Sequence, residues 1–324
     1  MNRRKFIAIA GGASFAISQP ISPQAQSGPF GKVGILSFGR VSTSTTVTIL
    51  RAEWQRLGYV EGEHVLLRGA EGDAMRLPGL VAELVGLKVR VIIAIGVGPV
   101  TAARQGTSTT PIVAIDLETD PVRAGYAVSF SRPTGNVTGL FMDMPSVAGK
   151  WIELLQEVAP TIKQVALIWD PATGPDQLES AKAAARSKRV DTVVIEANTA
   201  ENYDEDFKVL APDKPTGVVH LTAPAVRDAF PNIVAAAQKY QLPIISFQRI
   251  NAQAGALLTY GPRQESYFPR AMMLADRIVK GANVKDLPIE RPIHFELVVN
   301  LRTAKSMGIS MPQSILLRAD EVIE

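Results

Sequence analysis

The sequence predicts an α/β protein of two doubly wound, Rossmann-like lobes, each built on a parallel sheet and joined to the other by a three-segment hinge. Short apolar runs rich in Val, Ile and Leu alternate with segments of helical periodicity from Lys32 onward. The runs are continuously apolar, which is typical of parallel strands that helices cover on both faces. The alternation pauses near Phe141–Pro145 and starts again at Val165, so the chain divides into two halves.

Residues 1–26 are predicted to be a secretory signal peptide. A basic head, Arg3-Arg4-Lys5, precedes the apolar stretch Phe6–Ile17, which is shorter than the ~20 residues that span a bilayer. The paired arginines followed by Lys-Phe-Ile resemble a twin-arginine signal, and an ordinary Sec signal is the alternative. We therefore expect a periplasmic protein that does not insert into the membrane.

Composition excludes several classes of partner and site. Removing the signal lowers the 34 basic residues to 31, equal to the 31 acidic ones, so no nucleic-acid partner is expected. The chain has no cysteine, which excludes disulfides, thiol nucleophiles, cysteine metal sites and a lipid-modified cysteine. No later apolar run approaches the ~18–20 residues of a membrane helix.

In the first half the pattern predicts one strand before a pair of helices and two strands after it. The predicted strands are Val33–Ser37, Val91–Ile95 and Ile112–Ile115, and the predicted helices are Thr46–Leu57 and Leu77–Gly86. In the second half the predicted strands are Val165–Trp169, Thr192–Ala197, Gly217–Leu221, Pro243–Ser246 and Ala256–Thr259. The predicted helices there are Val147–Val158, Gln177–Ser187 and Ala225–Tyr240. Each half has roughly the size of a five-stranded doubly wound sheet.

The C-terminal segment is predicted to pass between the lobes. Helix Gln264–Val279 would cross back to the first lobe, and strand Phe295–Val299 with helix Leu301–Met307 would return to the second. Lobe 1 then comprises residues 30–141 and 261–290, and lobe 2 comprises 142–260 and 291–324. Ligands of open α/β sheets bind beyond the carboxyl ends of the strands, so the site is expected in the cleft between the lobes.

Catalytic and metal-binding patterns are absent from the sequence. The three histidines, His64, His220 and His294, stand singly and are expected to be structural. Neither a G-x-S-x-G nucleophile elbow nor a phosphate-binding P-loop occurs. No catalytic residue, metal or cofactor is predicted.

One segment imitates a dinucleotide-binding fingerprint. Strand Val91–Ile95 runs into Gly96-Val97-Gly98, and Asp116 follows at the end of the next strand. The third glycine position is Thr101, and the segment follows a later strand than the first. An exported NAD(P)-dependent oxidoreductase is therefore the alternative function. The favoured interpretation is a helix start whose free N–H groups bind a carboxylate.

Several segments in order carry a resemblance to a known family. They are Leu57-Gly-Tyr-Val-Glu-Gly-Glu63, Asp120-Pro121-Val122, Arg132-Pro-Thr-Gly-Asn-Val-Thr-Gly139, Gly255-Ala-Leu-Leu-Thr-Tyr-Gly261, Phe295-Glu-Leu-Val-Val-Asn-Leu301 and Leu317-Arg-Ala-Asp-Glu-Val-Ile323. The chain resembles the extracytoplasmic solute-binding proteins of ABC transporters, in the branch related to binders of tryptophan and other aromatic amino acids. The resemblance implies a type I periplasmic binding protein fold, a monomer that catalyses no reaction, a small-molecule ligand and a membrane permease as partner.

Two loops depart from the family pattern. Phe38-Gly39-Arg40 stands where the family usually has small residues, and Phe247–Ala252 lacks the acidic residues often found there. An amino group needs a carboxylate partner. The absence of acidic residues therefore leaves two ligand classes open, an amino acid and a carboxylic acid without an amine.

The candidate ligand-binding residues are those at the predicted carboxyl ends of strands. In lobe 1 they are Ser37, Phe38, Gly39, Arg40, Gly96, Val97, Gly98, Asp116 and Leu117. The last two belong to the predicted cleft segment Asp116–Glu118. In lobe 2 they are Trp169, Thr173, Thr222, Ala223, Phe247 and Arg249. Hydroxyls and helix-terminal N–H groups suit a carboxylate, and the aromatic side chains could enclose an apolar or aromatic body.

Overall fold

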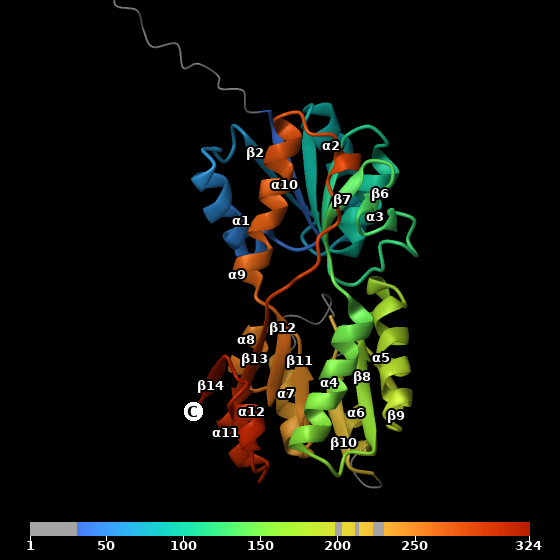
Figure 1. Ribbon diagram of the computed structural model, residues 1–324, viewed down its shortest axis with the longest axis vertical. Coiled ribbons are helices and arrows are strands. Elements are labelled where there is room, and N and C mark those ends of the chain that lie inside the picture. The colour runs from blue at the N-terminus through green and yellow to red at the C-terminus, as the bar shows by residue number, and fades with distance from the viewer. Residues whose placement is uncertain (1–30, 198–202, 211–213, 223–229) are drawn as a thin grey trace, which may run out of the picture.

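The computed structural model describes residues 31–197, 203–210, 214–222 and 230–324. They form two α/β lobes, one above the other in Figure 1, and this confirms the predicted fold class. The predicted signal peptide and Ala223 lie outside the described residues. In the described part of the chain, no helix is long and apolar enough to cross a membrane.

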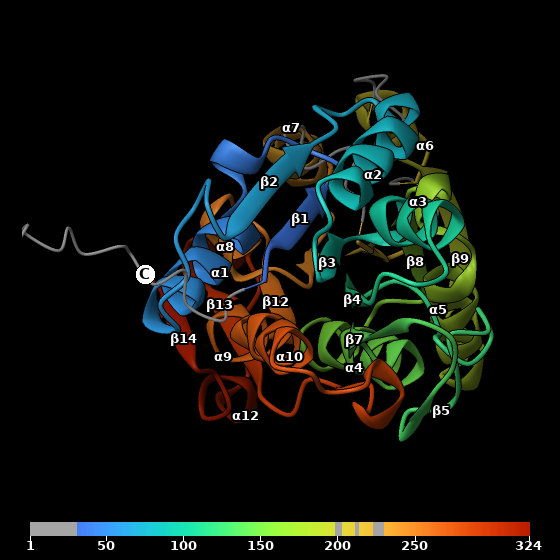
Figure 2. The same cartoon turned by 90° about the horizontal axis from the view of Figure 1, so that it is seen from above.

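The first sheet has five parallel strands in the order β2-β1-β3-β4-β7. Its strands are β1 (Val33–Ser37), β2 (Val65–Gly69), β3 (Val91–Ile95), β4 (Ile112–Asp116) and β7 (Val137–Phe141). Helices α1 (Thr45–Arg56) and α10 (Pro269–Val279) lie on one face, and α2 (Leu77–Gly86) and α3 (Val97–Gly106) on the other (Figure 2). A two-stranded hairpin of β5 (Ala127–Ser129) and β6 (Arg132–Pro133) precedes β7.

Strand β3 shows why the apolar runs are continuous. Val91 and Ile93 pack in the core layer beneath α1 and α10, whereas Ile92 and Ala94 pack in the layer beneath α2 and α3. Both faces of the strand are therefore buried, so alternation between apolar and polar residues is lost.

The second sheet has seven strands in the order β14-β13-β12-β11-β10-β8-β9. Its strands are β8 (Gln164–Trp169), β9 (Asp191–Glu196), β10 (Thr216–His220), β11 (Ile244–Ser246), β12 (Leu258–Pro262), β13 (Phe295–Asn300) and β14 (Glu321–Ile323). Its helices are α4 (Met144–Val158), α5 (Asp176–Ser187), α6 (Tyr203–Leu210), α7 (Phe230–Lys239), α8 (Arg249–Gln253), α11 (Leu301–Ser306) and α12 (Gln313–Leu316). The pairing of β13 with β12 is antiparallel. The predicted strand Phe295–Val299 is β13, and β14, which the sequence does not predict, extends the edge of this sheet beside it.

Some predicted elements differ from the observed ones. The predicted helix Gln264–Val279 is two helices, α9 (Gln264–Tyr267) and α10, and Pro269 begins the second. Proline has no N–H to donate, so it is tolerated at a helix start and breaks a continuous helix. The predicted helix Ala225–Tyr240 is α7, and residues 225–229 lie outside the described part.

Three segments connect the lobes, and one hydroxyl links them. The segments run from β7 to α4, from β12 to α9, and from Ile289 to β13 (Figure 1). Tyr267 Oη lies 3.2 Å from the carbonyl oxygen of Phe141 and 3.0 Å from that of Glu290, and it donates to this pair of carbonyls. Tyr267 belongs to the second connection, so the hydroxyl holds all three together. The residue bounds of the two lobes stay a prediction.

Candidate functional site

The candidate residues lie on two facing walls at the carboxyl ends of the two sheets. On the first wall, Ser37 ends β1, Gly96 follows β3 and Asp116 ends β4. On the second, Trp169 ends β8 and Phe247 follows β11. The walls touch, because α3 contacts the short 3-10 helix η3 (Pro171–Thr173) of the other lobe. The structure thus brings the two predicted sets together, and their role in binding stays a prediction.

A polar clasp joins the walls at the start of α5. The backbone N–H of Asp120 donates to Asp176 Oδ2 at 3.0 Å, and Arg123 Nη1 lies 3.0 Å from Asp176 Oδ1. Asp176 is mostly buried, and as an acid in the first helical turn it is also favoured by the helix dipole. These contacts span the lobes, so the structure shows the cleft closed on this side.

Gln177, the next residue of α5, organises the second wall. Its side chain is wholly buried, and its Nε2 donates to Thr173 Oγ1 at 2.5 Å and to the Thr222 carbonyl at 2.8 Å. Its Oε1 accepts from the Thr222 N–H at 3.0 Å and from the Thr222 hydroxyl at 2.7 Å. Gln177 is not among the residues that the sequence predicts at the cleft. A glutamine on the apolar side of a predicted helix was the available signal.

Two buried carboxyls lie at the end of β4. Asp116 is fully buried, and Glu118 is 8% exposed. Burial raises the pKa of Asp116, and burial with the charge of Asp116 raises the pKa of Glu118 to about 8. Thr222, from the other wall, acts on the Glu118 carboxyl in the opposite direction, favouring the ionised form. Glu118 ends the segment Asp116–Glu118 that the sequence predicts at the cleft.

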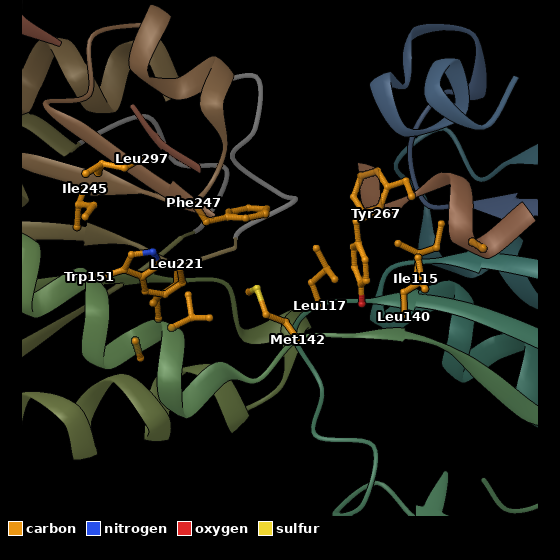
Figure 3. Packing of buried hydrophobic residues seen from close by; sticks show 14 of the residues in the cluster. Ile115, Leu117, Leu140, Met142, Trp151, Leu221, Ile245, Phe247, Tyr267 and Leu297 are labelled. Carbon is orange, nitrogen blue, oxygen red and sulfur yellow. The ribbon is translucent and has the colours of Figure 1, made fainter. Parts of the chain in front are cut away.

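An apolar cluster beside the hinge joins the two lobes. In Figure 3, Phe247 points from the second lobe toward Leu117 and Met142 and the first-lobe residue Tyr267. All four are buried and belong to one core cluster that spans both lobes. An aromatic body entering the cleft would meet Phe247 and Leu117 here.

Trp169 and Phe38 lie in different layers. Trp169 Nε1 donates to the Gly174 carbonyl at 2.9 Å, and the half-buried ring packs against the core cluster that spans both lobes. Phe38 packs against the cluster beneath α2 and α3. Their rings do not contact each other in the described part of the chain. Their enclosure of a flat ligand from opposite lobes stays a prediction.

The two candidate arginines lie at the rim. Arg40 Nε is 3.1 Å from Glu71 Oε2, and Arg249 Nε is 2.5 Å from Glu321 Oε2. Both side chains are exposed, and such surface pairs contribute about 0–1 kcal/mol. Each arginine already has a carboxylate partner in its own lobe.

The glycine turn before α3 offers free backbone donors. Gly96 has φ of 89°, a left-handed value that favours glycine, and a Cβ there would meet no atom. The first turn of α3 contains no acidic residue, so its positive end is open to an anion. Asp116, the acid of the dinucleotide interpretation, accepts through Oδ1 from the N–H groups of Glu118 and Thr119 within its own turn.

Among the described residues, no group of three or more His, Asp or Glu side chains could hold a metal ion. His220 is buried in the second lobe, where its Nδ1 lies 3.0 Å from Ser246 Oγ. Asn251 Nδ2 donates to the same oxygen at 2.7 Å. This network joins β10, β11 and α8, as expected of a structural histidine.

Comparisons with known proteins agree with this geometry. A family model described as ABC transporter substrate binding protein matches residues 42–323. The Tyrosine-binding protein of Clostridioides difficile (strain R20291) is 24% identical over 255 residues, which cover 78% of this chain and 73% of that protein.

Two solved structures show the fold. The ABC domain in complex with L-Trp from Streptococcus pneumonia has a TM-score of 0.81 at 20% identity, covering 90% of this chain and 99% of that chain. GanP, a glucose-galactose binding protein from Geobacillus stearothermophilus, has a TM-score of 0.61 at 15% identity, covering 83% and 97%. The expected type I periplasmic binding protein fold is thereby confirmed.

Proposed function

Because the chain belongs to the family of ABC transporter substrate binding proteins, we propose that it captures a small carboxylic acid with an aromatic body between its lobes. Binding proteins of this family catalyse no reaction, so the oxidoreductase alternative is dropped. The bound solute is then handed to a membrane permease of an ABC importer. The protein acts as a monomer in the periplasm, to which the predicted signal peptide directs it.

The relative named for tyrosine binding, matched over 78% of this chain, is the observation that carries the ligand class. The solved L-Trp complex supports the same class. Two features of the cleft are consistent with it. The open N-terminus of α3 suits a carboxylate, and Phe247 with Leu117 offers an apolar surface for an aromatic ring.

A thermal-shift screen followed by calorimetry tests the ligand class. L-Tyrosine, L-tryptophan and L-phenylalanine, and their oxo and hydroxy acids, should raise the melting temperature as ligand concentration rises. Glucose, galactose and simple inorganic cations serve as controls. Stabilisation by the sugars or cations, with none by the carboxylic acids, would overturn the proposal.

Cell fractionation tests the location. A mature protein lacking roughly the first 26 residues should be found in the periplasm, as expected for a cleaved signal. Replacing Arg3 and Arg4 by Lys should block export if the signal is of the twin-arginine type. Normal export of that variant leaves the Sec pathway, and a full-length precursor in the cytoplasm contradicts export itself.

A further inference from the structure

Asp116 and Glu118 are buried acids at the carboxyl end of β4. We propose that their carboxyls form an ammonium subsite, which binds the α-amino group of the ligand and makes the protein select amino acids over deaminated acids. This inference rests on the proposed function, since it names the chemical class within the aromatic carboxylic acids.

The hydrogen bonds leave one buried acceptor unused. Asp116 Oδ1 accepts from the N–H groups of Glu118, at 3.2 Å, and of Thr119, at 3.0 Å. Glu118 Oε2 accepts from the N–H of Leu117 at 3.1 Å. Asp116 Oδ2 is buried and meets no N–H or O–H donor in hydrogen-bond geometry, while the side chains of Thr119 and Glu118 act on the same carboxyl. A buried carboxylate oxygen without a donor is costly, so the turn is built for a donor that arrives with the ligand.

The charges point to the same conclusion. In the described part of the chain, no Lys or Arg forms an ion pair with either acid. The other titratable group that faces Asp116 is Tyr126, and Arg104 lies over the Tyr126 ring at 5.0 Å. Two adjacent carboxyls in a dry site cannot both stay ionised alone, so they hold a proton or acquire a cation. An ammonium group supplies both the charge and three donors.

The position of the pair suits an amino acid. Strands β3 and β4 are neighbours, and the Gly96 N–H donates to the Ile115 carbonyl at 2.8 Å. The open N-terminus of α3 therefore lies beside the acid pair. An amino acid carries its carboxylate and ammonium on one carbon, so it needs an anion subsite next to a cation subsite. The acid that segment Phe247–Ala252 lacks in the second lobe is thus supplied by the first lobe.

A metal ion is a poorer occupant of the same place. Among the described residues, the pair has no third ligand of the His, Asp or Glu type. Ca²⁺ and Mg²⁺ require six or more oxygen ligands, more than the four oxygens that two carboxyls contain.

Matched ligand pairs test the subsite. L-Tyrosine, L-tryptophan and L-phenylalanine are each compared by calorimetry with the propanoic acid that has the same ring and lacks the amine. The wild-type protein should bind at least one amino acid about tenfold or more tightly than its counterpart. Asp116→Asn and Glu118→Gln should lower that affinity about tenfold and leave the affinity for the propanoic acid equal or higher.

Controls separate a lost subsite from a damaged fold. Asn and Gln keep the acceptor oxygens that bind the N–H groups of the turn, so both variants should melt within a few degrees of wild type. Glu205→Gln, on the exposed side of α6, should change neither affinity. Amino acid binding at pH 7 should release protons to the buffer, seen as a heat that depends on buffer ionisation enthalpy. Glu118→Gln should abolish this dependence.

The outcomes are distinct. Equal wild-type affinity within every pair, or an unchanged preference in both variants, overturns the ammonium subsite and leaves the proposed function standing. Absence of binding by both members of all three pairs overturns the proposed function, and this assignment with it. Preference in wild type, its loss in both variants and proton release establish the subsite.

Discussion

His220 is held neutral by burial. His220 Nδ1 lies 3.0 Å from Ser246 Oγ, and Asn251 Nδ2 donates to the same oxygen at 2.7 Å. The other ring nitrogen, Nε2, has no hydrogen-bond partner, and the ring packs edge-on against Phe230, with centroids 4.7 Å apart. Burial lowers the pKa of His220 to about 4.

This pKa predicts how stability depends on pH. Between pH 6.5 and 4 the unfolded chain binds a proton at residue 220 that the folded protein excludes. The free energy of unfolding should therefore fall by about 3 kcal/mol as pH drops through this window. His220→Asn keeps an acceptor for Ser246. In this variant the melting temperature should depend less steeply on pH than in the wild type. His294→Asn, at an exposed position, should retain the wild-type slope, and equal slopes in all three proteins would contradict the prediction.

Gly98 tests the proposed anion subsite. It is exposed in the first turn of α3, and an added Cβ would meet only Leu77 Cδ1, at 3.5 Å. Gly98→Asp should fold normally, because an acid is favoured at a helix N-terminus. It should also abolish binding of carboxylic acids by occupying and charging their place. Gly98→Ala is the matched control and should retain binding, as measured by calorimetry.

For single residues, the sequence predicts their position in the fold better than it predicts which side chains they contact. The end of an apolar run marks where a strand ends, so Asp116, Thr173 and Thr222 could be placed at the cleft. That Gln177 binds both threonines depends on how α5 packs against the end of β10. Whether a Lys or Arg pairs with Asp116 depends on which side chains the second lobe places against the end of β4.

Among the elements, α5 and the turn after β4 form the clasp that spans the cleft. Asp176→Ala removes an acceptor for the Asp120 N–H and the ion pair with Arg123. One such hydrogen bond and a partly exposed ion pair contribute about 1–2 kcal/mol together, which should weaken ligand affinity roughly 5- to 30-fold. Since the clasp joins the two lobes, its loss should appear as faster ligand dissociation in stopped-flow measurements.

Asp191→Ala is the control for that experiment. Asp191 pairs with Lys214 at 2.7 Å on the surface of the second lobe, away from the first. The Asp191→Ala variant should leave the rate of ligand dissociation unchanged. Equal dissociation rates for wild type and Asp176→Ala would show that the clasp does not hold the closed form.

Elements with strong patterns were predictable, and weakly patterned ones were not. Buried β1, β3 and β4 lie close to their predicted bounds. The missed strand β2 lies at an edge and contains Arg68, so its pattern resembles a loop. The missed β7 contains Gly139, which weakens a strand signal and is required because a Cβ there would collide with the Ala114 backbone.

For the whole molecule, the three connections determine where bending occurs. Tyr267 fixes Phe141 and Glu290 at the first-lobe end of the hinge, and Arg270 binds Glu290 through two hydrogen bonds of 2.8 and 2.7 Å. Rotation is therefore confined to the residues between this cluster and the second sheet. Arg291 and Asp143, an exposed pair at 3.3 Å, lie within that stretch.

This arrangement predicts an equilibrium between open and closed forms that ligand shifts toward the closed one. Small-angle scattering should give a smaller radius of gyration with a saturating ligand than without it. Tyr267→Phe leaves two buried carbonyls without their shared donor, so it should lower the free energy of unfolding by about 1–3 kcal/mol. By freeing the hinge it should also enlarge the ligand-free radius, while saturating ligand restores the closed value. If a confirmed tight ligand leaves the wild-type radius unchanged, the lobes do not close on their ligand and the hinge interpretation is wrong.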